Sequence, residues 1–158
     1  MEFSDVIKNR YSCKKFSSEQ IGKDKLDAIL EAGRVAPTAK NLQEQHIYVV
    51  QSESALETID KLTPCRYNAP TVLIVAYNKN NVFTYLGDKR NSGIEDATIV
   101  ATHLMLAAYN EGVDSCWINF FNPDELAKAF NLPEDEEILM LLDLGVADKT
   151  TTPLPNHN

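Results

Sequence analysis

The stretch Ala36-Pro37-Thr38-Ala39-Lys40-Asn41-Leu42-Gln43 joins two regular patterns in the sequence. Before it, apolar residues recur at helical spacing over residues 23–34, and after it residues 46–51 have the composition of a strand. Pro37 fixes its own φ and disfavours helix at the preceding residue, so we expect the helix to end here. The stretch carries a hydroxyl, an ammonium and two amides on a short, stiff turn. A polar binding turn is one interpretation, and a capped helix end followed by a solvated loop is the simpler one.

A second polar stretch, residues 10–16, lies in the densest positive patch of the chain. Arg10, Ser12 and Lys14 alternate along it, so an extended backbone would place all three side chains on one side. A guanidinium, a hydroxyl and an ammonium that converge suit a phosphate group, whose oxygens accept charge-assisted hydrogen bonds. Phe16 is expected to anchor the segment in the core. A solvated basic loop is the alternative interpretation.

Helical and strand patterns interleave along the rest of the chain, which favours one α/β or α+β domain over residues 1–158. Further helices are expected at 4–9 with Ser4 as the N-cap, at 53–62, at 95–111 and at 123–130, and further strands at 71–77, 114–118 and 139–144. Asn122 and Pro123 have the residue types of an N-cap and a first helical position. The acidic run 134–137 is expected to be a solvated helix flank.

The longest predicted helix begins near Glu95 and Asp96 and ends near Gly112. Small and apolar residues surround most of its circumference, which is typical of a helix buried in a core or against a partner. We therefore expect a two-fold homodimer with these helices at its centre and more than ~2,000 Å² buried in total. His103, inside this helix, is expected to be a core or interface residue.

Composition excludes several classes of protein. The net charge of −8 over 158 residues argues against a nucleic-acid partner. No apolar run approaches the ~20 residues of a membrane span, and no secretory signal is visible, so a cytoplasmic location without membrane association is expected. Three widely spaced cysteines predict neither disulfides nor a zinc site. No glycine-rich phosphate loop or hydrolytic triad occurs, so we expect no catalytic side chain and a bound cofactor that carries the chemistry.

Four segments in order resemble the flavin-dependent nitroreductase family. Residues 10–16 (RYSCKKF) are similar to its R-x-S-x-[RK]-x-F signature, and residues 36–43 (APTAKNLQ) to its A-P-[ST]-x-x-N-x-Q turn. Residues 93–97 (GIEDA) resemble the start of its long central helix, and residues 115–120 (SCWINF) its C-W-[IV]-G-x-F segment. The resemblance implies an α+β fold with a central, mostly antiparallel mixed sheet flanked by helices, and a homodimer.

The resemblance also implies an FMN cofactor at the subunit interface and a ping-pong reaction. Hydride would pass from NAD(P)H through flavin N5 to a small aromatic acceptor such as a nitroaromatic or a quinone. The cofactor-binding residues implied, including a backbone N–H near Ile118 and Asn119 directed at N5, are Arg10, Tyr11, Ser12, Lys14, Pro37, Thr38, Asn41, Gln43, Trp117, Ile118, Asn119 and Lys149.

The chain departs from the family pattern in three places. Glu44 and Gln45 stand where the family commonly has Pro and Trp, and Asn119 stands where glycine is usual. The tail, residues 146–158, is short, has Lys149 as its only cation and is a candidate for exchange with the partner. These departures leave two alternatives open: a flavin-binding or flavin-sensing module with little turnover, and a dimeric scaffold without cofactor.

Overall fold

Four strands form the central sheet of the structure, a computed structural model that describes residues 1–157. The strands are β1 (Gln45–Val50), β2 (Thr71–Asn78), β3 (Asp114–Ile118) and β4 (Glu136–Gly145), in the spatial order β1-β2-β4-β3. All three neighbouring pairs are antiparallel, and a short parallel bridge joins Ser12 to Ser115 beside β3. The fold is therefore the predicted α+β type with a mostly antiparallel sheet.

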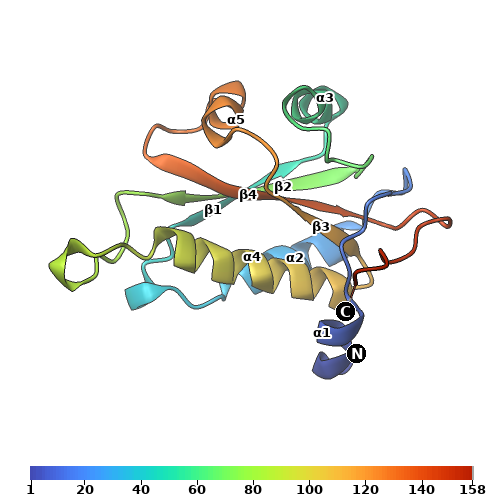
Figure 1. Cartoon of the computed structure of the whole chain (residues 1–158), viewed down its shortest axis with the longest axis horizontal. Helices are drawn as coiled ribbons and strands as arrows, with labels where there is room; N and C mark the ends of the chain where they lie inside the picture. Colours follow the sequence, from blue (N-terminus) through green and yellow to red (C-terminus); the bar gives the residue numbers. More distant parts are fainter. Residues whose placement is uncertain (158) are drawn as a thin grey trace.

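Helices cover both faces of this sheet (Figure 1). On one face lie α2 (Lys23–Arg34) and α4 (Gly93–Asn110), and on the other lie α3 (Glu53–Leu62) and α5 (Pro123–Ala129). The short helix α1 (Phe3–Asn9) projects from the body near the end of α4, and the single 3₁₀ turns η1 (Ala39–Asn41) and η2 (Leu86–Asp88) lie near its start. Three layers result, and the sheet is the middle one.

Successive side chains of β2 point to opposite faces of the sheet and so belong to two different core clusters. Leu73 and Val75 belong to the cluster beneath α2 and α4, whereas Val72, Ile74 and Ala76 belong to the cluster beneath α3 and α5. All five are fully buried, which agrees with the prediction of a strand covered on both faces. Each large side chain removed from water contributes roughly 1.5–3 kcal/mol, so this strand is the centre of the hydrophobic stabilisation.

Most helix ends agree with the predictions. The helix α2 has the predicted bounds, and Ser52 caps α3 by accepting a hydrogen bond from the Ala55 N–H. Asn122 accepts hydrogen bonds from the N–H groups of residues 124 and 125, and Pro123 is the first residue of α5. The prediction for Ser4 was wrong: α1 begins at Phe3, and the Glu2 carbonyl accepts the first N–H bonds.

Two other boundaries differ from the predictions by two residues or more. The helix α4 begins at Gly93, two residues earlier than Glu95, since the Ser92 carbonyl accepts the Asp96 N–H. The strand β4 begins at Glu136 rather than at residue 139, so the second half of the acidic run is strand and not a solvated helix flank. The buried Glu136 carboxylate is satisfied by hydrogen bonds with His46 and Tyr48 of β1, which local propensity does not reveal.

The helix α4 buries one stripe and exposes another. Its buried residues face the sheet and α2, where a Cβ added to Gly33 would lie 2.6 Å from Leu104 Cδ2. On its outer side, Ile94 is 62% exposed and Ile99 is 38% exposed. His103 is half-buried, so it does not belong to the core of the single chain. The core explains only part of the apolar circumference of this helix.

One carboxyl side chain lies in the middle of the sheet without a hydrogen-bond partner among the described residues. Asp143 of β4 is fully buried between Val72 of β2 and Cys116 of β3, and neither carboxyl oxygen has a partner among the described residues. Burial raises the pKa of Asp143 to about 9, which the Arg66 guanidinium partly opposes. The side chain is therefore a neutral acid at neutral pH.

Candidate functional site

The segment 10–16 is extended and is held by two backbone hydrogen bonds, one to β3 and one to the turn that precedes β2. The Cys13 N–H donates to the Ser115 carbonyl at 2.9 Å, and the Phe16 N–H donates to the Tyr67 carbonyl at 3.0 Å. The Cys13 and Phe16 side chains are both buried, as expected of a core anchor for Phe16. Ser12 and Lys14 are exposed on either side of the buried Cys13, and Arg10 is half-buried, so none of the three predicted side chains lies in the core.

These three side chains line a cavity of about 270 Å³. Its lining residues are Arg10, Tyr11, Ser12, Lys14, Leu154, Asn156 and His157. The structure thus brings the four predicted residues of the segment 10–16 together. Burial raises the pKa of Tyr11 to about 12, so its phenol stays neutral beside the two cations. A neutral donor, a hydroxyl and two cations form a donor set suited to an anion.

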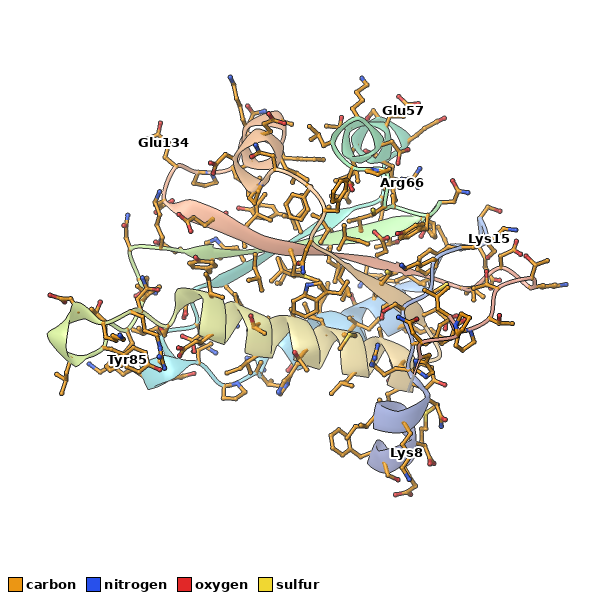
Figure 2. The ribbon with its side chains drawn as sticks, viewed as in Figure 1. Lys8, Lys15, Glu57, Arg66, Tyr85 and Glu134 are labelled. Carbon is orange, nitrogen blue, oxygen red and sulfur yellow. The ribbon has the colours of Figure 1, made fainter. Side chains whose placement is uncertain are left out.

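The tail closes this cavity, which sequence reasoning missed. The Lys15 ammonium donates to Thr150 Oγ1 at 3.0 Å, the Ser17 N–H donates to the Val146 carbonyl at 2.8 Å, and the His157 and Tyr11 rings meet edge to face with centroids 6.3 Å apart. Figure 2 shows Lys15 at the end of the molecule where the two segments lie together. Lys149 is exposed and does not line the cavity. The cation that binds the tail, through Thr150, is therefore Lys15.

The stretch 36–43 forms a tight turn. Thr38 Oγ1 accepts the Gln43 N–H at 3.0 Å, and the Thr38 carbonyl accepts the Asn41 N–H at 2.9 Å. Lys40, Asn41 and Gln43 have positive φ values of 53°, 53° and 50°. Such left-handed residues other than glycine carry strain of order 1–3 kcal/mol each and cluster at functional sites. Pro37 is exposed at the start of the turn.

The third group of predicted residues lies at the end of β3. The Trp117 indole N–H donates to Asn119 Oδ1 at 2.8 Å, which fixes the orientation of that amide. The Ile118 side chain is 4% exposed and packs in the core, so only its backbone is available for binding. Because Ser115 at the other end of this strand lies beside Ser12, β3 connects this group to the cavity.

The turn and the cavity lie at opposite ends of α4. Arg10 Nη1 lies 4.0 Å from the Met105 sulfur, whereas the Ala39 N–H donates to Asp96 Oδ1 at 3.0 Å. Residues 96 and 105 are separated by about 14 Å along a helix with a rise of 1.5 Å per residue. Figure 1 shows η1 at the start of α4 and α1 at its end. One chain therefore does not bring all the predicted residues into a single site.

Comparison with known proteins identifies the chain. The model of the Nitroreductase family matches residues 7–65 and 63–146, and these segments hold all four motifs described above. The chain belongs to the nitroreductase family. The match covers the cavity segment, the turn and β3, and among the predicted site residues it leaves out only Lys149 in the tail.

Solved and curated nitroreductases support this assignment. A nitroreductase family protein of Clostridium difficile 630 superposes with a TM-score of 0.91 at 32% identity, covering 98% of this chain and 88% of its own. An FMN-dependent nitroreductase of Clostridium difficile R20291 gives 0.79 at 25% identity, covering 97% and 92%. YodC of Bacillus subtilis (strain 168), provisionally named an NAD(P)H nitroreductase, is 28% identical over 92% of this chain and 89% of its own length.

Two negative findings concern the described residues, 1–157. No cluster of three His, Cys, Asp or Glu side chains there has an arrangement that could hold a metal ion. None of the helices in this part of the nitroreductase chain is long and apolar enough to cross a membrane.

Proposed function

We propose that this chain is an FMN-dependent oxidoreductase that moves hydride from NAD(P)H to a small acceptor such as a nitroaromatic or a quinone. The observation that carries the proposal is the convergence of Arg10, Ser12 and Lys14 on one cavity in a chain of the nitroreductase family. The named FMN dependence of one relative and the nicotinamide dependence in the name of another agree with it.

The cavity fits the phosphate end of FMN. Arg10 and Lys14 supply two positive charges, Ser12 supplies a hydroxyl, and none of the described residues that line the cavity is acidic. Hydrogen bonds from charged donors to phosphate are about twice as strong as neutral ones. The volume of about 270 Å³ is below the roughly 300–1,000 Å³ of sites that enclose a whole small molecule. We infer that the ring system lies outside it, against other surfaces.

A second protomer supplies those surfaces in our proposal. Thr38, Asn41 and Gln43 lie about 14 Å along α4 from the cavity of their own chain, so they serve the cavity of the partner. The exposed Ile94 and Ile99 of α4, with Phe3 and Ile7 of α1, provide apolar surface for such a contact. These four side chains are 62%, 38%, 66% and 51% exposed in the single chain.

The bound FMN supplies the chemistry of hydride acceptance and donation. The side chains of this protein bind and orient: Arg10 and Lys14 hold the phosphate, and the Trp117–Asn119 hydrogen bond fixes the backbone at the end of β3. NAD(P)H and the acceptor occupy the same face in turn, which gives ping-pong kinetics. Burial raises the pKa of Cys116 to about 12, so its thiol stays protonated and is not a nucleophile.

Absorbance spectroscopy of the purified protein tests the proposal. We expect flavin absorbance that bleaches when NADH or NADPH is added without oxygen and returns when a quinone is added. A protein that cannot be loaded with FMN would refute the proposal, and a loaded protein that neither nicotinamide bleaches would favour the flavin-sensing alternative.

The double variant Arg10→Ala, Lys14→Ala tests the phosphate site. Each lost charge-assisted contact should cost on the order of 1.5–3 kcal/mol of FMN binding, while the fold is kept because both side chains point away from the core. The matched control, Lys61→Ala with Lys128→Ala, removes the same charge from α3 and α5 on the other face of the sheet. Equal FMN affinity in the two double variants, measured by flavin fluorescence, would contradict the assignment.

A further inference from the structure

Two carboxyl groups are buried together at the base of the turn 38–43. Glu44, which follows the turn, is 2% exposed, and Asp96 in the first turn of α4 is 4% exposed. Among the described residues, no group donates a hydrogen bond to either Glu44 carboxyl oxygen or to Asp96 Oδ2. Two adjacent ionised carboxylates in such a place would be strongly unfavourable.

The pair ties the two ends of the turn to one helix. At the start of the turn, the Ala39 N–H donates to Asp96 Oδ1 at 3.0 Å. At its end, the main chain of Glu44 is fixed because its carbonyl accepts the Asn78 N–H of β2 at 2.8 Å. Burial raises the pKa of Glu44 to about 7, and the neighbouring Asp96 carboxyl contributes to this shift.

Charged groups on the surrounding elements do not neutralise the pair. Arg90 pairs with Glu95 at 2.7 Å, and Arg34 of α2 pairs with Glu31 at 2.6 Å. Lys40 of the turn lies over the Phe83 ring, 5.8 Å from its centroid. On β2, the Tyr77 hydroxyl donates to Glu137 at 2.9 Å. A proton is therefore the available means of stabilising Glu44 beside Asp96.

We infer that Glu44 is a positioning residue: it shares one proton with Asp96, and this proton holds the turn 38–43 closed in its left-handed conformation. The shared proton satisfies an oxygen on each side chain and fastens the end of the turn to the helix that already holds its start. The inference about the turn stands on these contacts alone, and only its effect on flavin rests on the proposed function.

The sign of the pH dependence follows from the two states of the turn. In an open, solvated turn the pKa of the Glu44 carboxyl returns to its ordinary value of 4.5. In the closed turn the pKa is about 7, so the carboxyl keeps its proton up to about that pH. Opening therefore releases a proton between these values, and the open fraction rises by up to tenfold for each pH unit in this window and levels off above it. From pH 5 to pH 7 the equilibrium constant for opening of the turn should therefore rise about fortyfold.

Hydrogen–deuterium exchange of the flavin-free protein tests the turn itself. After correction for the intrinsic pH dependence of exchange, protection of residues 39–44 should fall about fortyfold from pH 5 to pH 7 in the wild type. Glu44→Gln keeps the shape and donates an N–H to Asp96, so its protection should stay constant. The control Glu57→Gln removes an exposed carboxylate of α3 and should behave as the wild type. Equal pH dependence in the wild type and Glu44→Gln would overturn the inference.

Flavin affinity tests the consequence for the site. Glu44→Gln should bind FMN as tightly as the wild type at pH 5 and at least as tightly at pH 7.5, since its turn stays closed. The ionisation of the FMN phosphate near pH 6 affects both proteins equally and cancels in the comparison. Tighter binding by the wild type at pH 7.5 would overturn the positioning role. Failure of both proteins to bind FMN would instead refute the proposed function, and the exchange experiment would still test the turn.

Discussion

Replacing Asp143 with Asn should change how the stability of the protein depends on pH. The folded protein keeps the Asp143 proton up to about pH 9, whereas the unfolded chain releases it near 3.8. Unfolding therefore releases a proton between these values, so stability falls as pH rises, by about 1.4 kcal/mol for each unit. From pH 5 to pH 8 the wild type should lose about 4 kcal/mol through this group, a large part of the 5–15 kcal/mol of a typical domain.

Urea unfolding at half-unit steps of pH would measure this effect. Asp143→Asn keeps the shape of the side chain but does not titrate, so the difference in unfolding free energy between variant and wild type should grow in favour of the variant by about 4 kcal/mol between pH 5 and pH 8. The control Asp88→Asn, at an exposed site in η2, should run parallel to the wild type. Parallel curves for Asp143→Asn as well would refute the claim that Asp143 is a buried neutral acid. Glu44 titrates in both proteins and cancels in the difference.

Two further predictions concern packing and assembly. Gly33→Ala should destabilise the fold by about 1–3 kcal/mol in urea unfolding, because the new Cβ would lie 2.6 Å from Leu104 Cδ2, whereas Gly22→Ala, which meets nothing within 4 Å, should change stability by less than about 1 kcal/mol. The double variant Ile94→Glu, Ile99→Glu should convert the proposed dimer into monomers with weakened FMN binding, and light scattering at micromolar concentration would contradict this if the variant and the wild type had the same mass.

The fold could be predicted where a local rule acted alone. Asn122 and Pro123 fixed the start of α5 because a cap and a first-turn proline are defined by adjacent residues. The continuous apolar run of β2 identified a strand covered on both faces. Local rules failed at β4, since Glu136 is stabilised in the sheet by His46 and Tyr48, about 90 positions away. Contacts of that kind are not contained in a window of sequence.

In the candidate site, too, the features set by local sequence could be predicted and those set by distant contacts could not. The period of two along a strand was sufficient to place Arg10, Ser12 and Lys14 on one side, and the cavity contains all three. The contribution of the tail was not predictable, because it depends on pairing between Lys15 and Thr150, 135 positions apart. The left-handed residues Lys40 and Gln43 were also missed, because neither is a residue type that signals positive φ.

A two-fold axis across α4 would resolve the separation of the two polar groups. Such an axis, perpendicular to the helix near its middle, makes the α4 helices of two protomers antiparallel. The Asp96 end of one helix then lies beside the Met105 end of the other, which places the turn 38–43 of each protomer near the Arg10 cavity of its partner. The exposed Ile94 and Ile99 lie on the outward stripe that this contact needs. In the proposed dimer, each protomer thus contributes the phosphate site of one flavin and the turn of the other, so disruption of the helix contact should weaken FMN binding at both sites together.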